Sequence, residues 1–209
     1  MSLEELGRKF ARLATNLVMR SPRLWFLVRR PMRLQFDRLA PRWDAMRMPG
    51  AYAPYEAALD RVEPPPRLAL DLGTGTGGAA LAIARRFPEA EVVGVDLSPS
   101  MLDQARAKVP AELRGRVRFE LADASNLPHD DASFDLIGLS NMIPFFDELD
   151  RVLAPGGALI VAFSGGAGTP IYVSPERLRA ELRQRGFTDF ADFSTDPGIA
   201  LLARKGAQA

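Results

Sequence analysis

The chain has 209 residues, 47% of them hydrophobic and 25% charged, which is ordinary for one globular domain with its own core. It has no cysteine, which excludes disulfides, a thiolate nucleophile and cysteine-ligated metals, and its single histidine makes any other metal site improbable. No apolar run approaches the ~20 residues of a membrane span, and acidic residues stand where a secretory signal would be basic, so we expect a cytoplasmic protein.

The first fifty residues differ from the rest in charge. They hold 11 Lys/Arg against 4 Asp/Glu, whereas the remainder holds 16 against 22. Leucine and phenylalanine recur at three- and four-residue spacing among basic residues, which predicts an amphipathic helix over Leu3–Met19. Ser21 and Pro22 predict the cap of a second short helix, which we expect Pro31 to interrupt.

Two interpretations of this basic segment stay open. Its helices cover the sheet as the lid of a substrate pocket, or Trp25, Phe26 and the neighbouring arginines contact an anionic membrane surface or a lipid-like substrate. The second interpretation would place the protein at the membrane periphery. A nucleic-acid partner is disfavoured, because the rest of the chain is net acidic and carries no recognisable binding module.

A linker, Met48–Arg67, follows, with a helix from about Pro54 to Val62 and a rigid run of three prolines. Residues 67–87 then read as a buried strand, a glycine-dense turn and a helix. Gly73, Gly75 and Gly78 satisfy G-x-G-x-x-G, and Asp96 follows at the end of the next apolar run, about 20 residues on. This motif alone permits a nicotinamide or flavin enzyme, but glycine-rich strand-to-helix turns also occur on many α/β folds that bind no nucleotide.

Strands and helices alternate through the remainder. We expect strands at 92–96, 117–121, 134–140 and 158–163, and helices at 99–109, about 144–153, and 175–185, with Ser98 and Ser174 as N-caps. Asp196-Pro197-Gly198 joins two final strands in a tight, antiparallel turn. The pattern predicts an α/β fold with a doubly wound, mostly parallel seven-stranded sheet, a lid and linker over residues 1–63 and a core over 64–209.

Several segments resemble, in the expected order, the class I S-adenosylmethionine-dependent methyltransferases, whose fold is Rossmann-like. They are LALDLGTGTG, VVGVDLSPSML, ELADASNLP, FDLIGLSN and DRVLAPGGALIVAF, and the earlier FDRLAPRWD resembles the lead-in of the ubiquinone/menaquinone C-methyltransferase-like subgroup. The resemblance covers roughly Phe36 to the C-terminus. The antiparallel terminal hairpin also fits that family and counts against a nicotinamide enzyme.

The resemblance implies S-adenosyl-L-methionine as cofactor and S-adenosyl-L-homocysteine as product. Asp96 is expected to accept hydrogen bonds from the ribose hydroxyls, because a carboxylate with two acceptor oxygens suits a vicinal diol. Asp71 is expected near the cofactor's ammonium group, and Asp123 at the adenine edge. The full set of implied cofactor-binding residues is Asp71, Gly73, Thr74, Gly75, Gly77, Asp96, Leu97, Met101, Asp123, Ala124 and Asn141.

The sequence is less informative about catalysis. A sulfonium methyl donor is already activated, so positioning the acceptor is enough and no general base is required. Histidines that many relatives carry after the fourth strand are absent, and the candidate catalytic residues are Asp147, Tyr52 and Tyr172. Asp147 and its neighbour Glu148 fit equally well as helix-start acids, and His129 is expected in a solvated loop. SNMIPFF does not match the motif of enzymes that methylate nucleic-acid amines.

We therefore expect a methyltransferase acting on a small, apolar or aromatic acceptor, without a metal. The alternatives are a cofactor-binding but non-catalytic or regulatory protein of the same fold and, less favoured, a nicotinamide-dependent oxidoreductase. The acceptor atom and the oligomeric state stay open.

Overall fold

A computed structural model describes residues 3–47 and 49–207, so Met48, the first residue of the expected linker, lies outside the described residues. The strands are β1 (Leu68–Leu72), β2 (Glu91–Asp96), β3 (Val117–Leu121), β4 (Phe134–Ser140), β5 (Leu153–Phe163), β6 (Phe187–Thr195) and β7 (Gly198–Lys205). The α-helices are α1 (Leu3–Arg20), α2 (Trp25–Leu39), α3 (Ala53–Leu59), α4 (Gly78–Arg86), α5 (Pro99–Lys108), α6 (Phe146–Val152) and α7 (Pro175–Arg183). Short 3₁₀ helices occupy Pro22–Leu24, Ala40–Arg42, Ala111–Leu113 and Gly166–Gly168. No helix in this described part is long and apolar enough to cross a membrane.

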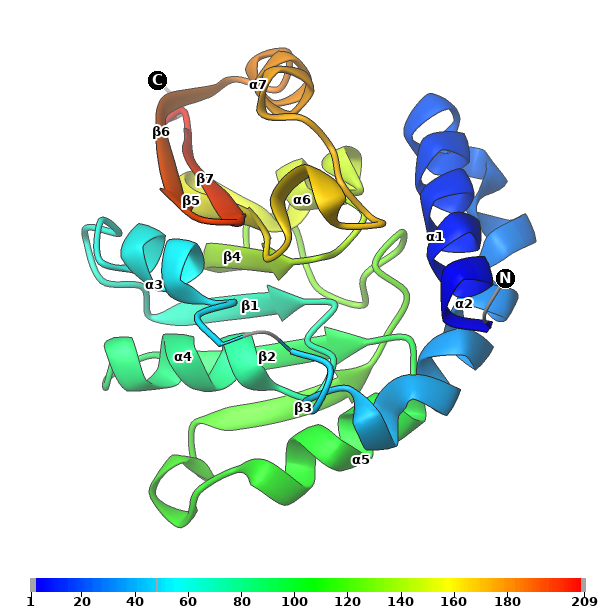
Figure 1. Cartoon of the computed structure of the whole chain (residues 1–209). Coiled ribbons are helices and arrows are strands. Elements are labelled where there is room, and N and C mark those ends of the chain that lie inside the picture. Colours follow the sequence, from blue (N-terminus) through cyan, green and yellow to red (C-terminus); the bar gives the residue numbers. More distant parts are fainter. Residues whose placement is uncertain (1–2, 48, 208–209) are drawn as a thin grey trace.

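The strands form one sheet in the order β3-β2-β1-β4-β5-β7-β6 (Figure 1). β1 pairs in parallel with both β2 and β4, whereas β7 runs antiparallel between β5 and β6. The predicted doubly wound, mostly parallel sheet with an antiparallel terminal hairpin is therefore confirmed. The strand order reverses between β1 and β4, which is where open α/β sheets bind ligands, beyond the carboxyl ends of the strands.

Each face of the sheet supports its own hydrophobic cluster. Successive residues of β5 alternate between them: Leu159 and Val161 pack with one cluster, and Ala158 and Ile160 with the other. This is the period-two geometry of a strand covered on both faces. Tyr55 of α3 is fully buried in the second cluster, where helices α3 and α4 cover the sheet.

Helices α1 and α2 lie together beyond the carboxyl ends of the parallel strands (Figure 1). Ala14 and Val18 of α1, and Trp25 and Met32 of α2, are buried in the first cluster with residues of β1, β2 and β4. The helix itself is confirmed, but its predicted apolar stripe is wrong: Ala14 and Val18 face the core, whereas Leu6 and Leu13 of the leucine series are 51% and 68% exposed.

The prediction that Pro31 ends the second helix is wrong. α2 begins at Trp25, after a 3₁₀ turn, and continues through Pro31 to Leu39. A proline in a helix interior costs about 3 kcal/mol, but Trp25 and Met32, two turns apart on one side of the helix, are both buried and hold it against the core. Ser21 occupies the N-cap position of the 3₁₀ turn, but its side chain makes no capping hydrogen bond.

Other boundaries were predicted to within a few residues. The ranges 117–121 and 134–140 match β3 and β4, and the Ser98 and Ser174 side chains cap α5 and α7 as expected. α3 ends at Leu59 rather than Val62, α6 begins at Phe146, and β5 begins at Leu153, because Leu153 already pairs with Phe134 before the register shifts.

Gly138 of β4 tests the packing of α3, because a Cβ atom there would overlap the buried Tyr55 hydroxyl. We expect Gly138→Ala to lower the free energy of unfolding by about 1–3 kcal/mol in urea denaturation, since overpacking strains a closed core. Tyr55 Oη has no hydrogen-bond partner among the described residues, so Tyr55→Phe should be neutral or slightly stabilising and should reduce the cost of Gly138→Ala.

Gly115→Ala is the matched control, because a Cβ there meets no atom within 4 Å. Equal stability of Gly138→Ala and Gly115→Ala would contradict this account of the core.

Candidate active site

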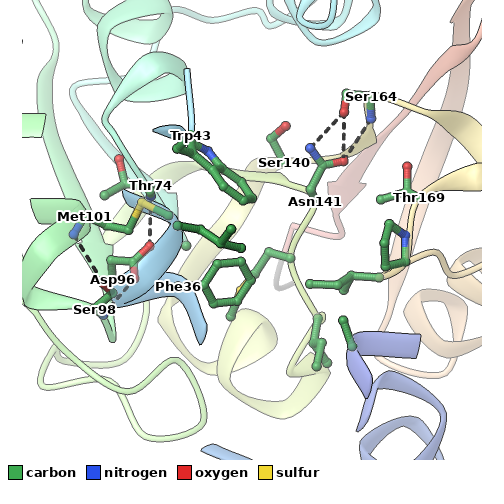
Figure 2. Close-up of a pocket in the computed structure, with 18 of the residues that line it drawn as sticks. Phe36, Trp43, Thr74, Asp96, Ser98, Met101, Ser140, Asn141, Ser164 and Thr169 are labelled. Atoms are coloured by element: carbon green, nitrogen blue, oxygen red, sulfur yellow. Dashed lines mark hydrogen bonds between the residues drawn. The ribbon is translucent and has the colours of Figure 1, made fainter. Parts of the chain in front are cut away.

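One cavity of about 500 Å³ lies where the strand order reverses, between the carboxyl ends of β1, β2 and β4 and the N-terminal helices (Figure 2). Most of the residues implied by the family resemblance meet there. They are Asp71, Gly73, Thr74, Gly75, Asp96, Leu97, Met101, Ala124 and Asn141. Gly77 and Asp123 do not line it.

Asp96 ties together the two turns that form the floor of the cavity. One carboxylate oxygen accepts the N–H of Gly75 at 2.8 Å, and the other accepts the N–H of Ser98, also at 2.8 Å. Gly75 has φ +53°, a left-handed conformation that glycine adopts without strain. Burial raises the pKa of the Asp96 carboxyl, and the backbone donors oppose that rise. Each oxygen keeps acceptor capacity for a further donor.

Asp71, at the end of β1, is a buried acid with half of its hydrogen-bonding capacity unused. It is 1% exposed, and Thr74 Oγ1 donates to its Oδ2 at 2.6 Å. Its Oδ1 has no hydrogen-bond partner among the described residues. Burial raises the pKa of Asp71 to about 7, although the Thr74 hydroxyl acts in the opposite direction. A cationic group in the cavity would both satisfy this oxygen and stabilise the carboxylate.

The opposite wall joins the end of β4 to the loop after β5. Asn141 has φ +54°, which asparagine tolerates better than most residues, and its side chain lies against Ser164 (Figure 2). Asn141 Nδ2 donates to Ser164 Oγ at 2.9 Å, and Asn141 Oδ1 accepts the Ser164 N–H at 2.9 Å. Thr169 also lines the cavity, and Arg12 of α1 donates to its carbonyl oxygen at 2.7 Å.

The N-terminal segment supplies an apolar and aromatic wall. Phe36 and Trp43 meet edge to face with ring centres 5.6 Å apart (Figure 2). Further lining residues from this segment and the facing loops are Trp25, Met32, Leu39, Tyr52, Ile143 and Ile171. From the sequence, these helices were one interpretation of the lid of a substrate pocket, but the three guanidinium side chains in this lining, those of Arg8, Arg33 and Arg47, were not predicted.

Asp123 does not line the cavity, because two side chains of α2 contact its carboxylate. Trp25 Nε1 donates to Asp123 Oδ1 at 2.8 Å, and Arg29 forms an ion pair with Oδ2 at 3.4 Å. The same carboxylate accepts the Ser125 N–H at 3.0 Å. No spacing in the sequence links residue 25 to residue 123. Only the neighbouring Ala124 lines the cavity as expected.

Two acids of the FDRLAPRWD segment fasten the N-terminal helices to the floor. Asp37 accepts a hydrogen bond from Ser98 Oγ at 2.6 Å, and Asp44 accepts one from Thr76 Oγ1 at 2.7 Å and pairs with Lys108. In the sequence, this segment was noticed only because it resembles the lead-in of a methyltransferase subgroup. Its acids connect the cover to the turns that follow β1 and β2.

Of the three candidate catalytic residues, only Tyr52 lines the cavity. Burial raises its pKa to about 12, although the Arg47 guanidinium, 4.6 Å from the ring centre, opposes the shift. Its hydroxyl therefore stays protonated at neutral pH and can donate a hydrogen bond. Asp147 is exposed and pairs with Arg185 at 2.7 Å, and Tyr172 packs on Phe163 outside the lining, so the structure brings neither to the cavity.

Two other loop residues are held by structural contacts. Glu148 accepts hydrogen bonds from Arg151 and from the Leu127 N–H, both at 2.8 Å. The expectation of a solvated His129 is wrong, because only 14% of its side chain is exposed. Its ring meets Phe134 edge to face at 5.0 Å and its Nε2 lies 3.5 Å from Glu120.

Comparison with known proteins agrees with this geometry. Residues 69–157 match the family model of a methyltransferase domain. The chain is 43% identical over 139 residues to the demethylmenaquinone methyltransferase of Thermus thermophilus, a match that covers 60% of this chain and 62% of that protein. It is 40% identical over 150 residues to the malonyl-[acyl-carrier protein] O-methyltransferase of Halorhodospira halophila, covering 66% of this chain and 49% of that protein.

A crystal structure of a SAM-dependent methyltransferase from Aquifex aeolicus superposes with a TM-score of 0.65 at 17% identity, covering 79% of this chain and 97% of that chain. That likeness shows a shared fold. The chain spans less than two thirds of the length of the two curated relatives.

The buried Asp71 predicts a pH dependence of stability. Asp71 has a pKa of about 7 in the folded chain but the ordinary aspartate pKa of 3.8 in the unfolded chain, so wild-type stability should fall as pH rises between these two values. Asp71→Asn carries no ionisable group there. Its free energy of unfolding relative to wild type should therefore increase between about pH 4 and about pH 7, by up to about 4 kcal/mol, and then level off.

Urea denaturation of both proteins across this pH range measures the difference. Asp130→Asn, in an exposed loop, controls for net charge. A stability difference between Asp71→Asn and wild type that stays constant with pH, or that decreases as pH rises, would disprove the inferred free-energy cost of ionising Asp71 in the folded chain.

Proposed function

We propose that this chain, whose residues 69–157 match the family model of a methyltransferase domain, is a class I S-adenosylmethionine-dependent methyltransferase of the ubiquinone/menaquinone C-methyltransferase-like subgroup, and that it methylates a small, lipophilic, aromatic-type acceptor. The observation that carries the acceptor class is the wall of the cavity. Trp25, Phe36 and Trp43 line the same cavity as the glycine turn and the acids Asp71 and Asp96.

The described residues fit the cofactor. Asp71 lines the cavity, and its buried Oδ1 has no hydrogen-bond partner among the described residues, so in this proposal its carboxylate stabilises the cofactor's ammonium group, directly or through water. Asp96 keeps a free acceptor site on each oxygen for the two ribose hydroxyls. In this proposal the backbone of residues 73–75 approaches the amino-acid portion, Leu97 and Met101 cover the adenine with Ala124 at its edge, and Asn141 lies near the methionine portion. Gly77 and Asp123 do not line the cavity, so this proposal gives them no contact with the cofactor.

The names of the two relatives described above give two kinds of acceptor, demethylmenaquinone and a malonyl group on acyl-carrier protein. An acceptor of the first kind matches the apolar wall, since burial of an aromatic ring against Phe36, Trp43 and Ile143 is favourable at about 25 cal/mol per Å². Arg8 and Arg33 in the lining are the one feature that favours a carboxylate.

In this proposal, methyl transfer requires the acceptor to be positioned in line with the methyl group and does not require a general base. When bound, the cofactor supplies a methyl group already activated by its sulfonium. The chain's own residues hold the acceptor, exclude water through the helical cover and donate a hydrogen bond from the protonated Tyr52 hydroxyl. Orientation of this kind accounts for roughly 7–11 kcal/mol in comparable intramolecular reactions.

The cofactor site is tested by calorimetry with S-adenosylmethionine and S-adenosylhomocysteine. We expect both to bind in about the micromolar range and Asp96→Asn to weaken both by about tenfold or more, or about 1.4 kcal/mol, because the amide loses one acceptor and disturbs the Gly75 turn. Asp103→Asn, on the exposed side of α5, should leave affinity unchanged. Absence of binding to wild type would contradict the proposal.

The acceptor is tested by methyl-transfer assays with short-tailed demethylmenaquinone in its reduced form and with a malonyl thioester. We expect turnover with the quinone-type ring and a fall of about tenfold or more in kcat/KM on Trp43→Ala, because this residue lines the cavity directly. Trp43→Phe should restore most of the activity. Turnover of the malonyl thioester alone, abolished by Arg33→Gln, would favour the carboxylate acceptor instead.

A further inference from the structure

Helices α1 and α2 present different side chains on their two sides. Their inner sides bury Ala14, Val18, Trp25 and Met32 against the core and the cavity. Their outer sides leave large apolar side chains in solvent, with Leu13 68% and Phe26 63% exposed. The exposed set is Leu6, Leu13, Phe26, Leu27 and Leu34.

On each helix, the exposed apolar residues share the outer side with basic residues that recur at helical spacing. On the outer side of α2 and the turn before it, exposed apolar and basic side chains alternate as Arg23, Phe26, Leu27, Arg30, Leu34 and Arg38. On α1, Leu6, Leu13 and Arg20 recur at seven-residue intervals on one side. We call the five apolar residues and Arg20, Arg23, Arg30 and Arg38 the outer patch. Exposed apolar residues gathered in this way mark an interaction surface more often than scattered ones do.

The charge of the segment is one-sided. Residues 6–36 contain eight Lys/Arg and no Asp/Glu. Inner cations have partners: Arg12 donates to carbonyl oxygens of the loop after β5, and Arg29 pairs with Asp123. The four arginines of the outer patch are exposed and form no ion pair or hydrogen bond within residues 3–47 and 49–207.

We propose that the outer patch docks on the surface of a bilayer that contains anionic phospholipids. Interleaved apolar and basic side chains match an interface in which acyl chains lie beneath negatively charged headgroups. A second copy of this chain is a poorer occupant, because a two-fold dimer through this patch sets the unpaired arginines against one another. A nucleic acid would pair with the arginines but leave Leu13, Phe26 and Leu27 in water.

Docking in this orientation brings the cavity next to the bilayer. α2 carries Phe26 and Leu34 on its outer side and Trp25, Met32 and Phe36 on the cavity side. A lipophilic molecule dissolved in the bilayer therefore has only the thickness of this helical layer between it and the cavity. Surface binding itself needs neither cofactor nor turnover, so it is measured independently of the methyltransferase activity.

The test is sedimentation with vesicles of phosphatidylcholine alone or with about a quarter phosphatidylglycerol, without cofactor. We expect the wild type to bind the anionic vesicles about tenfold or more tightly than the neutral ones, and salt to weaken binding. Phe26→Ser with Leu27→Ser, and separately Arg23→Glu with Arg30→Glu, should each reduce binding by about tenfold or more, because both apolar insertion and charge contribute. These side chains are exposed, so we expect the variants to remain folded, and thermal unfolding is the measurement that checks it.

The matched controls lie outside the patch. Leu121→Ser removes an apolar side chain that is 59% exposed on β3, and Arg85→Glu with Arg114→Glu reverses two exposed charges elsewhere; both should bind like wild type. The proposal would be overturned if the control variants lost as much vesicle binding as the patch variants. It would also be overturned if the wild type bound neither kind of vesicle. Tighter binding to a DNA duplex than to vesicles, or a concentration-dependent dimer lost in the patch variants, would assign the patch to those partners instead.

Discussion

The candidate site depends on the backbone of the glycine turn being held by the end of the neighbouring strand. The N–H groups of Gly73 and Thr74 donate to the Val95 carbonyl, each at 2.9 Å, and the Gly75 N–H donates to Asp96. Because Asp96 also accepts from Ser98, one carboxylate sets the turn after β1 and the start of α5 together. Parallel pairing of β1 with β2 makes this possible, since it ends both strands at the same edge of the sheet.

The helical cover is attached to that edge by polar contacts as well as by apolar packing. Trp25 bonds to Asp123, Asp37 to Ser98 and Asp44 to Thr76, and each contact joins the N-terminal segment to a loop beyond the carboxyl end of a strand. Buried or half-buried bonds of this kind contribute little net stability individually, about 0.5–1.5 kcal/mol, but they define one arrangement of the cover. The cavity is therefore shaped by the cover and the sheet jointly.

Short-range sequence patterns predicted the features that depend on neighbouring residues, namely the strands, the helix caps and the glycine turn. Alternating apolar runs located the strands, serine before proline located the caps of α5 and α7, and the glycine spacing located the turn that forms the cavity floor. Contacts between distant segments were beyond such patterns. Pro31 continues a helix because Trp25 and Met32 are buried, and Asp123 lies outside the cavity because Trp25 reaches it across 98 positions of sequence.

Two features of the molecule oppose its stability, one in the lining of the cavity and one on the outer side of the helices that cover it. Asp71 keeps a carboxyl in a dry environment with one oxygen unpaired, and the outer patch keeps Leu13, Phe26 and Leu27 in water. Burying each such apolar side chain would contribute about 1.5–3 kcal/mol, and neutral substitutions would relieve the acid. We infer that partners remove both costs. In the two proposals, a cation beside Asp71 and an anionic bilayer against α1 and α2 would do so from opposite sides of the helical cover, which would connect the place where a lipophilic acceptor dissolves with the place where it is held.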